Sequence, residues 1–158
     1  WLLAPYRLGA WINRHLWTRH QPAPDAVSDT VWLGRLPTPA ELAAHGFDAI
    51  VDLTAEFDTP VGARLSYNVP MLDLAVPPPA ALRRAVQALA QAEANAERVL
   101  VCCALGYSRS ALTVAAWLLH SGREAHVEGA IARVRAARPQ VVFSDAHRAL
   151  LTSFRNGG

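Results

Sequence analysis

Five residues separate Cys103 from Arg109 in the stretch VLVCCALGYSRSALTVAAWLL. The apolar run before Cys103 is typical of a buried strand, and the apolar run after Ser110 is typical of a helix. A loop that turns into a helix gathers unpaired backbone N–H groups and the positive end of the helix dipole, which together can hold a tetrahedral anion. Gly106 supplies the backbone freedom that such a turn needs. The pattern therefore predicts an anion-binding loop with a cysteine at its mouth.

Cys103 and Arg109 would have complementary roles in this loop. The planar guanidinium of an arginine can bind two oxygens of one phosphate group at once. The field of the helix end and of Arg109 favours the thiolate form of Cys103, which is the nucleophilic form. A thiolate in front of a cradled phosphate, with an arginine opposite, is the arrangement that phosphoryl transfer to sulfur requires.

These residues resemble the Cys-x5-Arg signature of protein tyrosine phosphatases, in particular that of small atypical dual-specificity phosphatases. The likeness extends over about residues 27–155, through SDTVWLGRLP and AIVDLTAEFD upstream and AIARVRAARP downstream. The resemblance implies that Cys103 is the nucleophile and that Ser110 is the hydroxyl that stabilises the thiolate when it leaves. It also implies a phosphate-binding loop that consists of Ala104, Leu105, Gly106, Tyr107, Ser108 and Arg109.

The family also uses a carboxylic acid on a separate loop, about thirty residues before the cysteine. Asp73 lies at that spacing, after a short strand signal and before three consecutive prolines. The resemblance implies that Asp73 protonates the leaving oxygen and then activates the water that hydrolyses the phosphocysteine. The alternatives are that Asp73 is only a turn residue, or that the acid is one of three weaker candidates tied to an earlier strand and its loop. These are Asp48, Asp52 and Asp58.

Cys102 departs from the family pattern, which usually has a histidine at this position. That histidine orients the loop through hydrogen bonds, and a thiol is a poorer donor. We interpret Cys102 as a small buried residue at the end of a strand, with a redox role as the alternative. Phe57, in the AEFD segment, is expected either to form an apolar wall beside the pocket or to belong to the core.

Strand and helix signals alternate along the rest of the chain. Strands are expected near residues 31–33, 49–53, 66–69 and 99–101, and helices near 39–45, 79–95, 111–120, 127–137 and 144–154. The pattern predicts an α/β fold with a central, mostly parallel, twisted sheet of four to five strands flanked by helices.

Composition limits the class of protein. The chain has 158 residues, 52% of them hydrophobic and 18% charged, which is typical of a single folded domain and excludes a disordered chain. A formal charge of +2 gives no reason to expect a nucleic-acid partner. The two cysteines are adjacent, which excludes a disulfide framework. The scattered histidines show no metal-ligand spacing, so we expect neither a metal nor a cofactor.

The first residues differ from the rest. Trp1–His20 contains three of the five tryptophans together with Arg7, Arg14 and Arg19. Such a mixture is favoured at the boundary between water and lipid, although the same tryptophans could instead pack onto the domain. We divide the chain into an N-terminal segment and linker (residues 1–24) and a dual-specificity phosphatase domain (residues 25–158).

The sequence also suggests a cellular context. The chain starts at Trp1 and has Met71 as its only methionine, which indicates a piece of a longer polypeptide. All 15 basic residues are arginine, which is associated with GC-rich bacterial genomes. The expected location is cytoplasmic, at the cytoplasmic face of a bacterial inner membrane.

Together these observations predict a metal-independent hydrolase of phosphate monoesters. Relatives that act on highly charged inositol lipids tend to have basic residues in this loop, whereas Ala104, Leu105 and Tyr107 are uncharged. The resemblance therefore argues against polyphosphoinositides as substrates. Phosphorylated proteins or a lipid with one phosphate group remain. Two alternatives are a rhodanese-type sulfur transferase, which also uses a loop cysteine, and an inactive phosphopeptide-binding module.

Overall fold

The computed structural model describes residues 23–157 of the chain. Its five strands are β1 (Asp25–Ala26), β2 (Val31–Arg35), β3 (Ala49–Thr54), β4 (Leu65–Met71) and β5 (Val99–Cys103). Its helices are α2 (Pro39–His45), α3 (Pro79–Asn95), α4 (Arg109–His120), α5 (Val127–Ala137) and α6 (Asp145–Arg155). The predicted alternation of strands and helices is confirmed.

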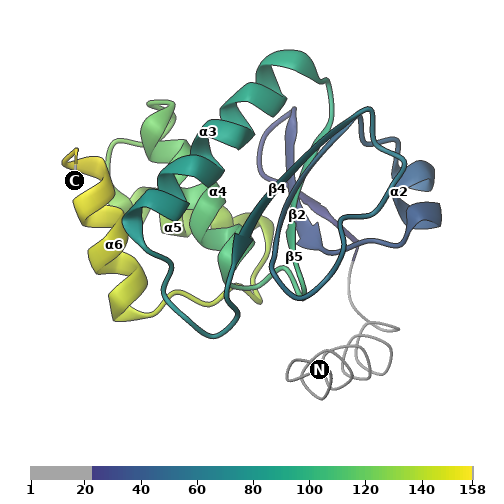
Figure 1. Ribbon diagram of the computed structural model, residues 1–158. Helices are drawn as coiled ribbons and strands as arrows, with labels where there is room; N and C mark the ends of the chain where they lie inside the picture. Colours follow the sequence, from purple (N-terminus) through teal and green to yellow (C-terminus); the bar gives the residue numbers. More distant parts are fainter. Residues whose placement is uncertain (1–22, 158) are drawn as a thin grey trace, which may run out of the picture.

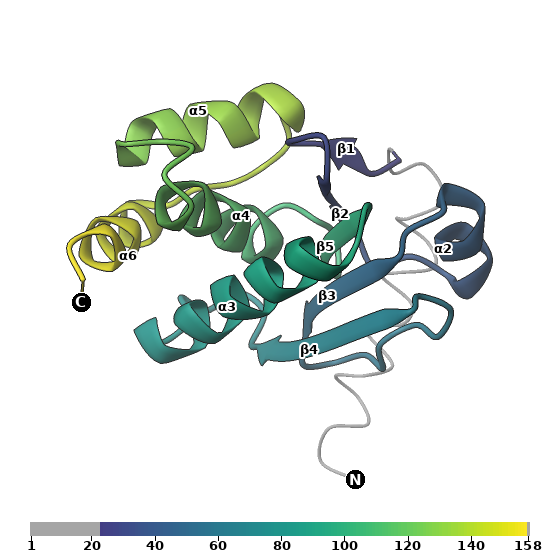
Figure 2. The same cartoon turned by 90° about the horizontal axis from the view of Figure 1, so that it is seen from above.

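The strands form one sheet in the order β1-β2-β5-β3-β4. The pairs β2–β5, β5–β3 and β3–β4 are parallel, whereas β1 pairs antiparallel with β2 at the edge. Helices α3, α4, α5 and α6 gather on one side of the sheet, and α2 lies on the other side (Figure 1, Figure 2). The predicted fold class, an α/β fold around a mostly parallel sheet, is confirmed.

The two faces of the sheet have cores of unequal size. The larger core lies between the sheet and the helices α3 to α6, and α4 is buried on nearly all sides within it. The smaller core lies under α2 and contains Leu36, Leu42, Phe47, Ile50, Leu100 and Cys102. Successive side chains of a strand point to opposite faces. Cys103 therefore belongs to the larger core and Cys102 to the smaller one.

Local sequence explains why α2 forms where it does. The Thr38 side chain accepts a hydrogen bond from the Glu41 N–H, and the Glu41 carboxylate accepts one from the Thr38 N–H. Pro39 occupies the first turn, and Gly46 ends the helix with φ of 64°. These are the capping signals that the sequence predicts.

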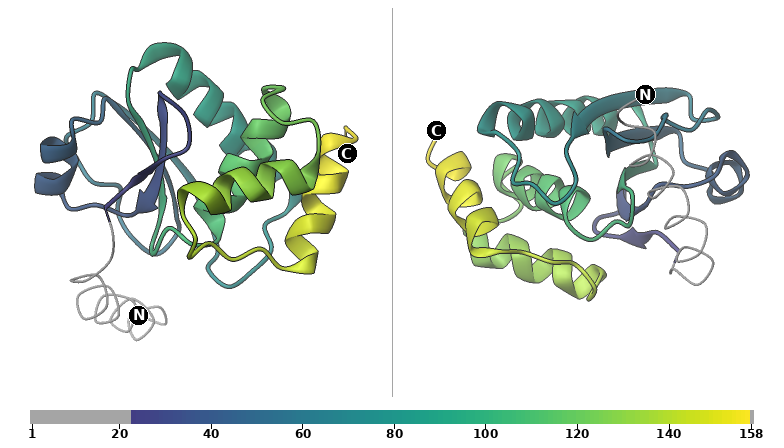
Figure 3. Two further views of the ribbon diagram at one scale, coloured as in Figure 1. Left: turned by 180° about the vertical axis from the view of Figure 1, so that it is seen from behind. Right: turned by 60° about the horizontal axis from the view of Figure 1, so that its bottom comes forward.

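The parallel strands bring three loops to one edge of the sheet. The connections that follow β4 and β5, and the α5–α6 connection, lie at the lower side of the molecule in Figure 1, and Figure 3 turns this side toward the viewer. The carboxyl edge of a parallel sheet is where such folds position their sites.

One sequence prediction concerns residues that the structure does not describe. The membrane-facing segment Trp1–His20 lies outside the described residues. Between residues 23 and 157, the structure has no helix with the length and apolar character needed to cross a membrane.

Candidate active site

The β5–α4 loop is packed against the end of β2. Gly106 has φ of 74°, a left-handed conformation that glycine adopts without strain. A Cβ atom at this position would lie 2.4 Å from the carbonyl carbon of Gly34 and 2.7 Å from the backbone nitrogen of Arg35. Only glycine therefore lets the loop turn this closely past the neighbouring strand.

Helix α4 begins at Arg109, two residues earlier than the sequence predicts. Ser108 is its N-cap residue, but the Ser108 side chain makes no capping hydrogen bond, and the first turn contains no acidic residue. The N–H groups of this turn thus keep their capacity to bind an anion. Ala104, Leu105 and Tyr107 are half-buried around the loop.

Cys103 and Ser110 are brought together. The Sγ atom of Cys103 lies 3.2 Å from the Oγ atom of Ser110, and both residues are buried. A thiolate has no proton to give, so the Ser110 hydroxyl donates to sulfur whenever Cys103 is ionised. This contact is the one that a hydroxyl stabilising a leaving thiolate requires.

Cys102 is separated from this chemistry. It is fully buried in the smaller core, on the opposite face of the sheet from Cys103. Burial, followed by the charges of Asp52 and Cys103, raises the pKa of Cys102 well above its usual value. Cys102 therefore remains a thiol that packs as a small apolar residue, in accord with the first interpretation of it.

The hydrogen bonds of Arg109 are made by its two terminal nitrogens, Nη1 and Nη2. Its Nη1 atom donates to Glu56 Oε2 at 2.9 Å and to the Met71 carbonyl at 3.0 Å, and its Nη2 atom donates to Glu56 Oε1 at 2.7 Å. Its Nε atom is buried and has no hydrogen-bond partner among residues 23–157. A buried donor without an acceptor is costly, and an oxygen of a bound phosphate would satisfy it.

The charge of Arg109 is secured by its surroundings. Burial works against the charged form, but the hydrogen bonds to Glu56 and the charges of Cys103, Glu56 and Asp73 raise the pKa of Arg109 above its usual value. The guanidinium is therefore a permanent cation beside the cysteine.

Glu56 is a site residue that the sequence analysis missed. Its side chain is 4% exposed and fixes the plane of the Arg109 guanidinium by the two-pronged contact. Burial opposes the ionisation of Glu56, but hydrogen bonding to Arg109 and the charge of Arg109 outweigh burial, so the pKa of Glu56 is lowered. The available signal was its place directly after β3, at the carboxyl edge of the sheet.

Glu56→Gln should lower both stability and activity. Removing one partner of a buried ion pair costs about 3–5 kcal/mol, and for a chain of this size we expect Tm at neutral pH to fall by about 10 °C. Because the pKa of Glu56 is lowered on folding, its contribution is present above the unfolded value of 4.5 and is lost as pH falls through the folded value. The difference in Tm between wild type and variant should therefore shrink in acid.

The matched control for this prediction is Glu128→Gln. Glu128 pairs with Arg148 at the surface, with 69% of its side chain exposed, so its loss should change Tm by little. Equal Tm values for wild type and Glu56→Gln at neutral pH would show that the pair does not order the guanidinium.

Asp73 reaches Arg109 from the loop between β4 and α3. Its Oδ1 atom lies 3.3 Å from Arg109 Nη2, and its side chain is 39% exposed. The three weaker candidates occupy other places. Asp52 is buried and accepts hydrogen bonds from Thr54 and Thr59, Asp48 accepts from the Glu97 and Arg98 backbone, and Asp58 is exposed.

Arg138 holds the loop from behind and was also missed in the sequence analysis. It is fully buried, and it donates from Nε to the Gly106 carbonyl at 3.1 Å and from Nη2 to the Leu105 carbonyl at 3.4 Å. In a planar trans peptide, the N–H points opposite to the carbonyl. The N–H groups of Gly106 and Tyr107 are therefore turned away from Arg138.

A salt bridge anchors Arg138 in turn. Its Nη1 atom donates to Asp25 Oδ2 at 2.7 Å and to the Ala23 carbonyl at 3.3 Å. Strand β1 thus contributes to the shape of the loop, although it contributes no side chain to its front.

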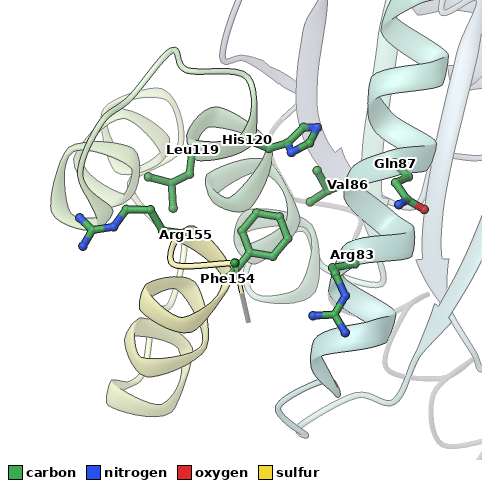
Figure 4. A pocket seen from close by; sticks show the side chains of 8 residues that line it. Arg83, Val86, Gln87, Leu119, His120, Phe154 and Arg155 are labelled. Atoms are coloured by element: carbon green, nitrogen blue, oxygen red, sulfur yellow. The ribbon is translucent and has the colours of Figure 1, made fainter.

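The cavity shown in Figure 4 is a separate feature. It has a volume of 370 Å³ and lies where Leu119 and His120 end α4, with Arg83 and Phe154 in its wall. Arg109 begins the same helix at its other end. No predicted site residue lines this cavity, so the candidate site is confined to the loops at the carboxyl edge of the sheet.

Comparisons with known proteins agree with the fold. The family model of the dual specificity phosphatase catalytic domain matches residues 31–157. The crystal structure of Tk-PTP in the active form has a TM-score of 0.74 and 24% identity, covering 85% of this chain and 97% of that chain. No protein of curated function matches the sequence.

Two further solved structures are similar. Human DUSP28 has a TM-score of 0.73 and 22% identity, covering 84% of this chain and 96% of that chain. PTPMT1 in complex with PI(5)P has a TM-score of 0.72 and 23% identity, covering 85% of this chain and 95% of that chain. At these identities the structures share the fold.

Proposed function

The chain belongs to the dual specificity phosphatase family, and we propose that it hydrolyses phosphate monoesters through a phosphocysteine intermediate, without a metal or cofactor. The observation that carries the proposal is the buried Arg109 Nε without a partner among the described residues, at the end of a loop that begins with Cys103. A phosphate group in this loop would complete the hydrogen bonding of Arg109 and stand before the cysteine.

The first step transfers the phosphoryl group to sulfur. The Cys103 thiolate attacks phosphorus, and the bond between phosphorus and the leaving oxygen breaks. Asp73 gives its carboxyl proton to the leaving oxygen. Arg109 and the N–H groups of Gly106 and Tyr107 hold the remaining phosphate oxygens and their charge.

The second step releases phosphate. The Asp73 carboxylate takes a proton from water, whose oxygen attacks phosphorus, and the bond between sulfur and phosphorus breaks. The electron pair returns to Cys103 as a thiolate, and the Ser110 hydroxyl at 3.2 Å donates to it. Cys103 is then again a thiolate and Asp73 again carries its carboxyl proton, as before the first step.

The two alternatives fit the site less well. A sulfur transferase does not need a carboxylic acid 3.3 Å from the arginine that would bind the anion. An inactive binding module does not need a hydroxyl in contact with the cysteine sulfur. Hydrolysis of para-nitrophenyl phosphate in EDTA, inhibited by orthovanadate, tests the proposal. Absence of turnover would contradict it and favour a binding module.

Asp73→Asn should slow the enzyme most for poor leaving groups. General acid catalysis supplies ~10²–10⁴-fold, and only where the leaving oxygen needs a proton. We expect a loss of that size with alkyl phosphates and a small loss with phosphates of acidic phenols.

Asp58→Asn is the control for this series, because Asp58 is an exposed acid on the β3–β4 connection. The measurement is kcat across a series of leaving groups. A uniform loss across the series in Asp73→Asn would assign Asp73 a role in binding or folding instead.

The proposed substrates are phosphorylated proteins or a lipid with one phosphate group. The similar structure of PTPMT1 contains PI(5)P, which supports a phosphorylated lipid as one possibility to test. We further propose that Trp1–His20 holds the catalytic domain at a membrane surface on the cytoplasmic side, and that residues 25–158 form that domain. Nucleic acid has no part in the proposal.

A further inference from the structure

Exposed aliphatic side chains gather around the candidate site. The large hydrophobic residues that are exposed in the described part of the chain are Val61, Leu72, Leu74, Val76 and Val142. All but Val61 lie on two segments that adjoin the site. We call Leu72, Leu74, Val76 and Val142 the apolar rim.

One contact from each segment ties it to the phosphate-binding loop. Leu72 and Leu74 flank Asp73, whose carboxylate is 3.3 Å from Arg109. The N–H of Val142 donates to the carbonyl of Tyr107 at 2.7 Å. The segments that carry the apolar rim therefore border the loop that would hold the phosphate group.

The loop that carries Asp73 is poorly suited to a peptide. Its sequence, LDLAVPPP, has no hydrogen-bonding side chain other than Asp73. The three prolines lack an N–H, so this end of the loop cannot donate backbone hydrogen bonds to an extended peptide. Aliphatic contact is what the loop can offer.

Leu74 is the most telling residue of the rim. It is 101% exposed, and its φ of 58° lies in the left-handed region that disfavours leucine and tolerates glycine or asparagine. A leucine at this position is unfavourable for two reasons: the backbone conformation disfavours it, and its apolar side chain is exposed to water. We therefore expect the Leu74 side chain to contact a molecule outside the domain.

The described part of the chain begins behind the phosphate-binding loop. Arg138 binds the Ala23 carbonyl as well as the Gly106 carbonyl of the phosphate-binding loop. In the sequence, Ala23 is preceded by Trp1–His20 with its tryptophans and arginines. Aliphatic side chains at the rim, and a Trp- and Arg-rich segment earlier in the same chain, are the chemistry that a lipid surface accepts.

On these grounds we propose that the apolar rim inserts into a lipid bilayer and that the substrate is a membrane lipid with one phosphate monoester. This inference rests on the proposed function and names its substrate class. Leu72 and Leu74 enter the apolar edge of the bilayer, so that the lipid phosphate meets Cys103 without leaving the membrane.

The test compares one head group in two physical states. The vesicle-borne substrate is phosphatidic acid in phosphatidylcholine vesicles, and the soluble one is a short-chain phosphatidic acid below its micelle concentration. The double variant Leu72→Gln/Leu74→Asn removes the leucines, and Asn tolerates the left-handed backbone, so its Tm should not fall. The control is Val61→Gln, which removes an exposed aliphatic side chain away from the rim.

The measured quantity is kcat/KM on vesicles divided by kcat/KM on the soluble lipid. We expect this ratio to fall by about ten-fold or more for each leucine that is replaced, given the free energy of burying one leucine side chain. The control should keep the wild-type ratio. Vesicle co-sedimentation of the double variant should weaken in parallel.

Other outcomes separate the two proposals. If the wild type does not hydrolyse para-nitrophenyl phosphate, the proposed function fails. If it does, but the double variant keeps the wild-type ratio, the bilayer inference is overturned. A selective loss on a phosphotyrosine peptide, with the vesicle ratio unchanged, would overturn it in favour of peptide binding.

Discussion

Cys103→Ser is expected to lower kcat on phosphate monoesters by roughly 10⁴-fold or more while the fold is kept. A serine hydroxyl is not ionised at neutral pH and cannot replace the thiolate as nucleophile. Cys103 is 3% exposed and already faces the Ser110 hydroxyl, so a serine of similar size finds a polar partner there. The measurements are kcat on an aryl phosphate, Tm and orthovanadate binding, the last two being retained.

The control is Cys102→Ala. Cys102 packs among apolar residues of the smaller core, where alanine leaves only a small cavity and serine would bury a hydroxyl. Activity should largely survive this change. Loss of turnover in Cys102→Ala together with full turnover in Cys103→Ser would reverse the assignment of the nucleophile.

Arg109→Lys should be nearly as damaging. Arginine divides its donors, with Nη1 and Nη2 bound to Glu56 and Nε left for an incoming oxygen. A lysine ammonium cannot serve both sides, because its donors leave from one atom. It would also leave Glu56 incompletely paired in the interior. We expect kcat/KM to fall by at least about 10²–10³-fold, as when a donor to a transition-state oxyanion is removed.

The loss in Arg109→Lys should appear in kcat as well as in KM, and orthovanadate should inhibit the variant weakly. Arg148→Lys is a suitable control, because Arg148 forms an ion pair with Glu128 at the surface. Wild-type kcat/KM in Arg109→Lys would show that the mechanism does not need an arginine that binds Glu56 through Nη1 and Nη2 and the phosphate through Nε.

Local sequence was sufficient to predict much of the fold. The Thr38–Glu41 capping pair and the Pro39 and Gly46 boundaries gave α2, and apolar runs gave β3 and β5. Strand β1 was not predicted, because two residues are too few to show a period and its pairing with β2 is not local.

The candidate site shows the same division. Cys103, Gly106, Arg109 and Ser110 follow one another in a loop and the helix it opens, so their association could be predicted. Glu56 meets Arg109 across 53 residues, and Arg138 meets Gly106 across 32. The sequence positions of Glu56 and Arg138 do not identify them as site residues, because their roles depend on how the loops come together at one edge of the sheet.

The link from Arg138 to Asp25 and Ala23 bears on where the catalytic unit begins. Sequence similarity to the family starts at residue 31, yet the groups that anchor Arg138 lie before that point. A recombinant domain begun at residue 31 would keep the nucleophile and the clamp. It would leave a buried guanidinium without its carboxylate and free the Leu105 and Gly106 carbonyls to rotate. A unit that keeps both anchors of Arg138 is therefore longer than the stretch that matches the family model, because it includes Ala23 and Asp25.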